Sequence, residues 1–371
     1  DLKSLHSIGI TCAHVVPEKG IFKGKSDLVI LNDELTSISK DVTQVLEFKT
    51  SRWSDRKYPN SLLGVIAVMR QTFLDASWYH RSLDIIKKYP NENKPLPLNP
   101  SLHEIGNFIN GQLPILFITR EEHGAIRSLN IANEFNLRPW LLGSGYEYRR
   151  LETIKKHKPF MIFPLEFPEK PQVRDSHIAL QFTNEQLKHW DMAPDNIKRA
   201  FDAGLRFSFT SGTLKNKTIF RENLRRIIER GLPRDVALSA LTTYPALAMG
   251  LEQYIGKVQP GYVANLVVTD GDYFDPNSRV TSIWLAGKEK YVSEKIAPSY
   301  AGKWKVKVEK SDYELEFMIP DKYHKSKKSF NDALAKNLLD GKFKIEEKRV
   351  NLMDLKIDGK TVEFKIEGGL F

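Results

Sequence analysis

Apolar residues follow two different spacings along the chain, and the spacing changes near residue 264. Before that point, short apolar runs alternate with longer stretches whose apolar residues recur every three or four positions. The clearest example is the run Leu205–Thr210, which a small polar turn joins to a stretch with Phe220, Leu224 and Ile227 on one helical face. Short buried strands that alternate with amphipathic helices predict a parallel sheet covered by helices.

The same pattern predicts a regular order of elements. Strands are predicted near Val16 and at residues 27–31, 42–49, 114–119, 139–143, 159–165 and 205–210. Helices are predicted at residues 122–135, 146–157, 184–190 and 195–204, around 220–230, and in a strongly amphipathic stretch after Ser61. Lys87–Pro100 is rich in Pro and Asn and is predicted to be a surface connection.

From Ala264 onward the apolar residues alternate with polar ones, which predicts half-buried strands. The first group lies at residues 265–269, 281–285 and 289–292. A second group lies at residues 301–308 and 313–319 and near Lys344, Leu355 and Val362. The chain is therefore expected to end in β structure.

Three ordered motifs carry a family resemblance. Thr242–Gly250 reads T-x-x-P-A-x-x-x-G, Gly256–Val268 contains P-G-x-x-A-x-L-V-V, and Val280–Lys288 reads V-x-x-x-W-x-x-G-K. Together they resemble the closing segment of the amidohydrolase superfamily, of the imidazolonepropionase-like kind, although Asn265 stands where that family usually has Asp. The resemblance implies an α/β fold with a partial TIM-like (β/α) barrel, a small β-sandwich and appended C-terminal β strands.

A second resemblance concerns the long predicted helix. The run from Tyr58 to Tyr79 resembles a secreted amidohydrolase-like subgroup of Bacteroidetes-type bacteria, which implies a periplasmic or secreted location. Since Asp1–Leu5 reads as the end of a helix, we expect an N-terminal segment with the first barrel strand to precede it. The expected domains are a barrel at residues 1–250, a β-sandwich segment at 251–296 and a β-rich region at 297–371.

The family resemblance also implies a divalent metal such as zinc at the carboxyl ends of the barrel strands. Family members hold it with His after the first, fifth and sixth strands and Asp after the eighth, and the ion generates a hydroxide nucleophile. The first strand would lie before Asp1. The other three positions hold Thr119 or Arg120, Gly143 or Ser144, and Ser211. The expected ligands are therefore not found in this chain, and the cofactor stays unknown.

Residues that follow predicted strands are the candidates for a site at the barrel mouth: Arg120, Glu121, Ser144, Glu166 and Ser211. His14 and Glu166 are the substitute metal ligands to consider, although a lone His is more often a packed, hydrogen-bonded residue. Glu121 could instead stabilise the start of a helix, because a carboxylate interacts favourably with the helix dipole there. Glu147 could do the same for the next predicted helix. The amides of Gly143–Gly145 could bind an anion or form a tight βα turn.

The amino-acid composition limits the kinds of partner that the chain is expected to bind. Lys and Arg number 56 against 46 Asp and Glu, a net charge of +10 that is spread along the chain, so nucleic acid is not expected as a partner. The single cysteine, Cys12, excludes an intrachain disulfide and a Cys-based zinc site. No run approaches the roughly 20 apolar residues of a membrane span. A small-molecule ligand, an N-terminal companion segment or a homo-oligomer remains open.

Two functions follow from this reading. The first is a metal-dependent hydrolase of carbon–nitrogen bonds other than peptide bonds, whose ligands lie on the preceding segment or on residues such as His14 and Glu166. The second is a non-catalytic barrel that serves as a binding or assembly module. Because the expected ligands are missing, the sequence leaves open whether the chain is an enzyme.

Overall fold

A computed structural model describes residues 2–51, 58–92, 94–171, 180–292, 301–308, 311–320, 339–345, 348–358 and 361–366. The chain divides into two compact units, residues 1–292 and 293–371. Each unit is described by itself. The predicted boundary between residues 296 and 297 lies outside the described residues, and the boundary between 250 and 251 stays a prediction.

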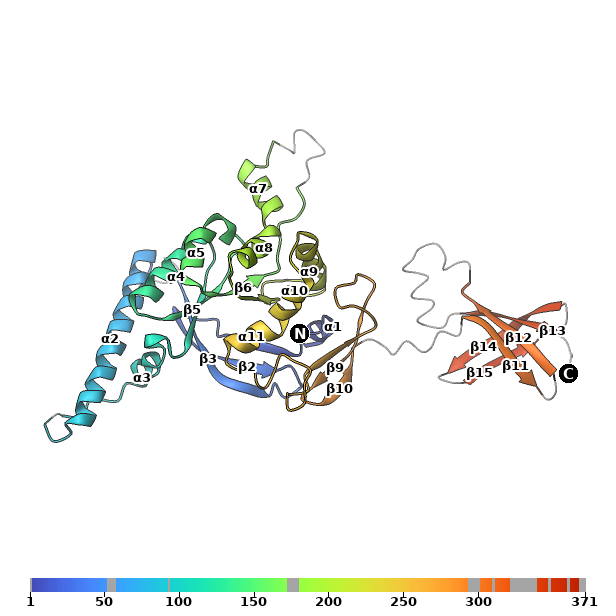
Figure 1. Ribbon diagram of the computed structural model, residues 1–371, viewed down its shortest axis with the longest axis horizontal. Helices are drawn as coiled ribbons and strands as arrows, with labels where there is room; N and C mark the ends of the chain where they lie inside the picture. Colours follow the sequence, from blue (N-terminus) through green and yellow to red (C-terminus); the bar gives the residue numbers. More distant parts are fainter. Residues whose placement is uncertain are drawn as a thin grey trace. The chain divides into compact units, whose positions relative to one another are not determined.

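A seven-stranded sheet in the order β1 to β7 organises the first unit (Figure 1). Its strands are β1 (Cys12–Val15), β2 (Phe22–Ile30), β3 (Ser37–Glu47), β4 (Pro114–Ile118), β5 (Arg138–Leu142), β6 (Phe160–Pro164) and β7 (Phe207–Thr210). Strands β3 to β7 pair in parallel, and the sheet curls into half of a barrel. The predicted α/β fold with part of a barrel is confirmed.

Strand β2 departs from the prediction. It pairs antiparallel with both β1 and β3, and β2 and β3 are much longer than the predicted strands at residues 27–31 and 42–49. The polar residues Lys23, Lys25 and Ser26 hid the strand, because backbone pairing does not require apolar side chains. Gly24, at φ +106°, lies where the register with β3 shifts, which is typical of a β-bulge.

Helices cover one face of this sheet (Figure 1). They are α1 (Leu2–Ser7), α2 (Leu62–Lys88), α3 (Pro100–Gly106), α4 (Glu122–Glu134), α5 (Leu151–His157), α7 (Asn184–Met192), α8 (Asp195–Asp202), α9 (Ile219–Glu229), α10 (Arg234–Leu241) and α11 (Thr243–Ala248), with short 3-10 turns η2 (Ile109–Gly111) and η3 (Glu147–Arg149). Phe73, Leu129 and Leu224 of these helices share a buried core with Phe117 and Phe207 of the sheet. Burial of each such side chain contributes roughly 1.5–3 kcal/mol.

The opposite face of the sheet has its own apolar cluster. Val45, Leu116 and Trp140 pack there with Leu28 of β2 and with Ala248 at the end of α11. Since successive residues of a strand point to opposite faces, Glu47 shares the face of Val45. This second face is the inner face of the half-barrel.

One helix prediction needs correction, and one short helix was not predicted. The helix predicted at residues 146–157 is a 3-10 turn, η3, followed by α5, with the break at Arg150. The connection predicted at Lys87–Pro100 leads into a short helix, α3, whose N-cap Asn99 accepts a hydrogen bond from the amide of Leu102. Both departures arise from local backbone hydrogen bonds that an apolar pattern does not reveal.

The segment after α11 forms a separate sheet in the order β10-β9-β8. Its strands β8 (Leu266–Thr269), β9 (Val280–Leu285) and β10 (Lys288–Tyr291) are antiparallel. Val280, Ile283 and Leu285 pack against Ile30 of β2. A sandwich requires a second facing layer, and the described strands of this segment form one sheet, so the predicted sandwich stays a prediction.

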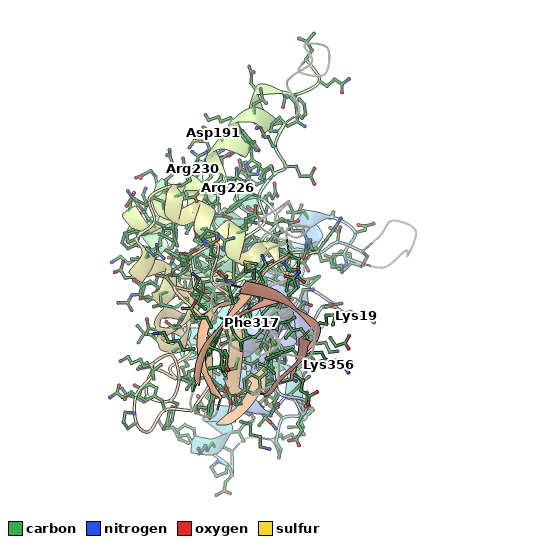
Figure 2. All side chains as sticks on the ribbon, turned by 90° about the vertical axis from the view of Figure 1, so that its right-hand side faces the viewer. Lys19, Asp191, Arg226, Arg230, Phe317 and Lys356 are labelled. Atoms are coloured by element: carbon green, nitrogen blue, oxygen red, sulfur yellow. The ribbon has the colours of Figure 1, made fainter. Side chains whose placement is uncertain are left out.

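The second unit contains a five-stranded antiparallel sheet, β11 to β15. Its strands are Gly302–Val308, Ser311–Met318, Asp340–Ile345, Lys348–Asp358 and Thr361–Ile366. Figure 2 looks onto this sheet, where Phe317 is buried together with Leu315, Ile319 and Leu339. In β12, Leu315 and Phe317 alternate with Glu314 and Glu316, which gives this strand one buried face.

Candidate functional site

Parallel strands end at one edge of a sheet, so the residues that follow β3 to β7 are neighbours along this edge. These positions hold Glu47, Thr119 and Arg120, Gly143 and Ser144, Leu165 and Glu166, and Thr210 and Ser211. We call this edge the mouth. The structure thus places Arg120, Ser144, Glu166 and Ser211 along one edge, as their positions in the sequence predict.

The mouth contains an ion cluster around Glu47. Oε2 of Glu47 lies 2.8 Å from Nζ of Lys23, and Oε1 accepts a hydrogen bond of 2.6 Å from Nε of Arg120. The side chains of Lys23 and Glu47 are 2% and 4% exposed, whereas that of Arg120 is 75% exposed. One buried carboxylate therefore joins a buried ammonium to a guanidinium that faces solvent.

Burial and neighbouring cations have opposing effects on the pKa of the Glu47 carboxyl. Its burial acts to raise its pKa, but the hydrogen bonds and charges of Lys23 and Arg120 outweigh that effect and lower the pKa below its ordinary value. Glu47 is therefore ionised at neutral pH and is not a proton donor there. Its carboxylate fixes the guanidinium of Arg120, which keeps further N–H donors for an external oxygen.

Ser144 belongs to a different arrangement. Its amide and hydroxyl both donate to Oε1 of Glu147, and the amide of Gly145 donates to Oε2 at 3.1 Å. Asn196 of α8 donates to the same Oε2 at 2.7 Å. The amides after β5 do bind an anion, but it is the chain's own, fully buried Glu147. Glu147 therefore ties the turn to α8, rather than only favouring the start of a helix.

Ser211 follows β7 and contributes its backbone. Its carbonyl oxygen, together with that of Leu214, accepts a hydrogen bond from Nζ of Lys217. This contact closes the loop between β7 and α9. The lysine is part-buried and is held by two carbonyl groups, so the polar turn has a defined conformation.

The two predicted glutamates, Glu121 and Glu166, both follow Arg120 in the sequence. Glu121 is exposed and forms an ion pair with Arg127; it is the N-cap residue of α4, yet its side chain makes no capping hydrogen bond. Glu166 is exposed just beyond β6. Neither of them touches the cluster of Glu47.

His14 lies on β1 in a neutral polar network. Its Nε2 is 2.6 Å from Oγ of Ser26, which in turn contacts Thr43 of β3, and its ring meets the edge of Trp140. Burial lowers the pKa of His14 to about 4, with a smaller opposing effect from the charge of Asp27. His14 is therefore neutral at pH 7 and acts as a packed, hydrogen-bonded residue in this network.

The polar stretches around His177 and His189 predict that both lie on the surface. His189 instead joins an aromatic stack. His189 of α7 stacks on Tyr146, with ring centroids 3.7 Å apart, and its pKa is lowered by burial and by Arg149. Arg149 in turn lies over the ring of Tyr146. This stack joins α7 to the segment after β5. His177 lies outside the described residues.

An open cavity lies elsewhere, between η3, α5 and α8. Its volume is about 600 Å³, and Arg149, Arg150 and Arg199 contribute to its wall. Arg149 is already paired with Glu185. The cavity shares no residue with the Glu47 cluster, so we place the candidate site at the mouth.

The next feature of the mouth is its set of side chains that could coordinate a metal ion. Among the described residues, no three side chains of His, Cys, Asp or Glu come together as a metal would require. At the strand ends where the family has metal ligands, this chain has Arg120, Ser144 and Ser211. The carboxylate of Glu47 is paired with two cations, and the ring of His14 is hydrogen-bonded to Ser26. The part of the chain that the structure describes therefore does not fit the metal set that the family resemblance implies.

Part of the sequence is similar to known amidohydrolases. Residues 175–293, less than half of the chain, match the model of the amidohydrolase family. Over this stretch the chain is similar to an amidohydrolase family domain. A segment of 60 residues is 34% identical to amidohydrolase tasK of Hapsidospora irregularis, which is 16% of this chain and 6% of that protein.

The solved structure of an amidohydrolase from Thermotoga maritima MSB8 is similar over most of the chain. The two share 18% sequence identity with a TM-score of 0.64, and the likeness covers 78% of this chain and 74% of the other. At this identity the likeness concerns the fold. It covers a larger part of the chain than the family match over residues 175–293 does.

Glu47 and Lys23 were not among the residues that the sequence singled out. Lys49, another charged residue near the end of the predicted strand at residues 42–49, is exposed beyond the end of β3. An available signal was the charge of Glu47 within the apolar run Val45–Phe48, on the face of Val45. The partner Lys23 could not be found, because its position depends on the register of β2 with β3.

Proposed function

We propose that this chain is a hydrolase that cleaves carbon–nitrogen bonds other than peptide bonds, and that Arg120 binds a substrate oxygen at the mouth. The observation that supports the proposal is the Glu47 cluster. A guanidinium that is fixed by a buried carboxylate and still exposed is suited to bind an anionic or carbonyl oxygen. The amidohydrolase family domain supplies the reaction class.

Each residue of the cluster has a distinct part in this proposal. Lys23 neutralises Glu47, so the carboxylate is stable in a buried position. Glu47 orients the Arg120 guanidinium toward the mouth before substrate arrives, which reduces the entropy lost on binding. Arg120 then donates to a substrate carboxylate or to the oxygen of the bond under attack.

Several finer features belong to the same proposal. They are closure of the half-barrel into a complete (β/α) barrel, membership of the imidazolonepropionase-like subgroup, and a periplasmic or secreted location. The family match favours the hydrolase over the non-catalytic module, because the proteins that it groups are named for hydrolysis. In the described part of the chain, no helix combines the length and apolar character needed to cross a bilayer.

The test is an activity screen with a matched pair of variants. The chain is incubated with cyclic amides and N-acyl amino acids, with Zn²⁺ or Mn²⁺ added or with a chelator, and product release is followed by chromatography. We expect Arg120→Gln to lower kcat/KM at least about tenfold for substrates with a carboxylate, since a charged hydrogen bond is lost.

Arg230→Gln is the control. Arg230 is a surface arginine at the C-terminal end of α9, and its Nη2 lies 3.2 Å from Oδ1 of Asp191; both residues are labelled in Figure 2. Its substitution should leave kcat/KM unchanged. Absence of hydrolysis of every substrate under every metal condition would contradict the proposed reaction, and equal losses in both variants would contradict the role of Arg120.

A further inference from the structure

Helix α2 carries an exposed apolar stripe along its outer side. Leu63, Leu74, Trp78 and Ile85 are 74%, 54%, 54% and 52% exposed, although each is a large apolar residue. At about 100° per residue they fall within a sector of about 60° on the helix surface. Figure 1 shows α2 as a long helix along one side of the first unit.

The opposite side of α2 is buried in the unit. Val65, Met69, Phe73 and Ala76 are all fully buried and belong to the main core. Because this face lies about 180° from the stripe, α2 is already held in place without the stripe. The stripe therefore contributes nothing to the packing of α2 on its own unit.

The spacing of the stripe identifies the shape of its partner. Positions 63, 67, 74, 78, 85 and 89 are all apolar or aromatic and are separated by four, seven, four, seven and four residues. This is an eleven-residue repeat, in which apolar positions stay on one line of a nearly straight helix. A stripe of this kind fits a second long helix with the same repeat, and another copy of α2 has that repeat.

The charges beside the stripe indicate the orientation of such a pair. Arg70 and Lys88 lie on one flank, and Arg81 lies at the edge of the stripe on the same side. Arg70 also pairs with Glu134 of its own unit. The other flank carries Gln71 and Asp75. An antiparallel twofold pair would bring the two basic flanks together. A parallel pair brings the basic flank of one helix to the polar, acidic flank of the other, which avoids like-charge repulsion.

We infer that α2 forms a parallel, twofold symmetric pair with α2 of a second copy of this chain, through the stripe centred on Leu74 and Trp78. One pair of helices buries less surface than a standard protein interface, so the dissociation constant should be on the order of 1–100 µM. This pairing is independent of the proposed hydrolase function, because the mouth and the stripe share no residue.

Sedimentation velocity over about 1–100 µM chain tests the dimer. Trp78→Glu and Leu74→Glu should each raise the dissociation constant at least about tenfold, since each places a charge in the centre of the contact. Leu238→Glu is the matched control: Leu238 is 50% exposed on α10, outside the stripe, and its substitution should change nothing. Circular dichroism verifies that each variant is folded.

Cysteine cross-linking tests the orientation. Ala67 lies on the stripe, and a parallel pair in register brings the two Ala67 side chains face to face. Mild oxidation of Ala67→Cys should therefore give a covalent dimer, whereas Asp84→Cys, on α2 about 100° away from the stripe, should not. A chain that stays monomeric throughout the concentration range, or variants that dissociate no more than Leu238→Glu, would overturn the pairing. A dimer without the Ala67 cross-link would overturn its parallel orientation.

Discussion

Two buried glutamates of the first unit have opposite surroundings. Glu47 is the last residue of β3, and Glu147 lies in η3, which follows β5 of the same sheet. Glu47 is held by two side-chain cations, Lys23 and Arg120, and one of these faces solvent. Glu147 is held by backbone amides of its own turn and by Asn196, all of which are neutral donors. Both carboxylates follow apolar strands, yet only the first is connected to the surface by a charged group.

This difference separates a structural carboxylate from a candidate site. The donors around Glu147 are fully used in joining the segment after β5 to α8, so nothing remains for a ligand. Glu47 instead carries an arginine whose donors are only partly used. The identity of the donors, rather than the burial of the carboxylate, therefore distinguishes the two roles.

The largest expected effect comes from breaking the Glu47 cluster. Glu47→Leu should lower the free energy of unfolding by about 3–5 kcal/mol, because Lys23 remains buried without its counter-ion. Chemical denaturation followed by circular dichroism measures this. The double variant Lys23→Met with Glu47→Leu should recover much of the loss. A double variant that is less stable than Glu47→Leu would show that the two residues are not coupled.

The second effect concerns the structural carboxylate. Glu147→Ala should lower the free energy of unfolding by about 2–3 kcal/mol, because the amides of Ser144 and Gly145 and the side chain of Asn196 lose their acceptor. Denaturation of the exposed control Glu152→Ala should differ from the parent by less than about 0.5 kcal/mol. A stable Glu147→Ala chain with unchanged hydrogen exchange in α8 would contradict this account.

The third effect is a loss of unfolding free energy that occurs only at acidic pH. His14 has a pKa of about 4 in the folded chain against an ordinary 6.5, so the unfolded chain binds a proton first as the pH falls. Its contribution to stability is therefore complete above pH 6.5 and is lost between pH 6.5 and about 4. His14→Gln, which can still form a hydrogen bond with Ser26, should flatten the decline in unfolding free energy over this window. An unchanged slope would contradict the role of His14.

The smallest effect separates binding from stability at the mouth. Arg120→Gln should change the free energy of unfolding by less than about 1 kcal/mol, because its side chain is 75% exposed and the ion pair is screened by water. The same variant is expected to lose activity. A large loss of stability, measured by denaturation, would make Arg120 a structural partner of Glu47 and remove it from the candidate site.

Much of the first unit could be predicted from the sequence, since each parallel strand is a short apolar run and each covering helix has an apolar face. Strands β4 to β7 and helices α4, α9 and α10 follow this rule. The antiparallel strand β2 was largely missed. Its polar residues Lys23 and Ser26 reach partners on β1 and β3 that lie far away in the sequence.

The sequence by itself determined the order of strands and helices, the strand ends that could carry chemistry, and the residue types at those ends. Periodicity and turn residues are local properties, and local patterns suffice for these features. Only the tertiary structure decided that Glu47 joins Lys23 to Arg120 and that Glu147 occupies the amides after β5. Those contacts depend on strand register and on the packing of α8, which fix distances between residues that the sequence places far apart.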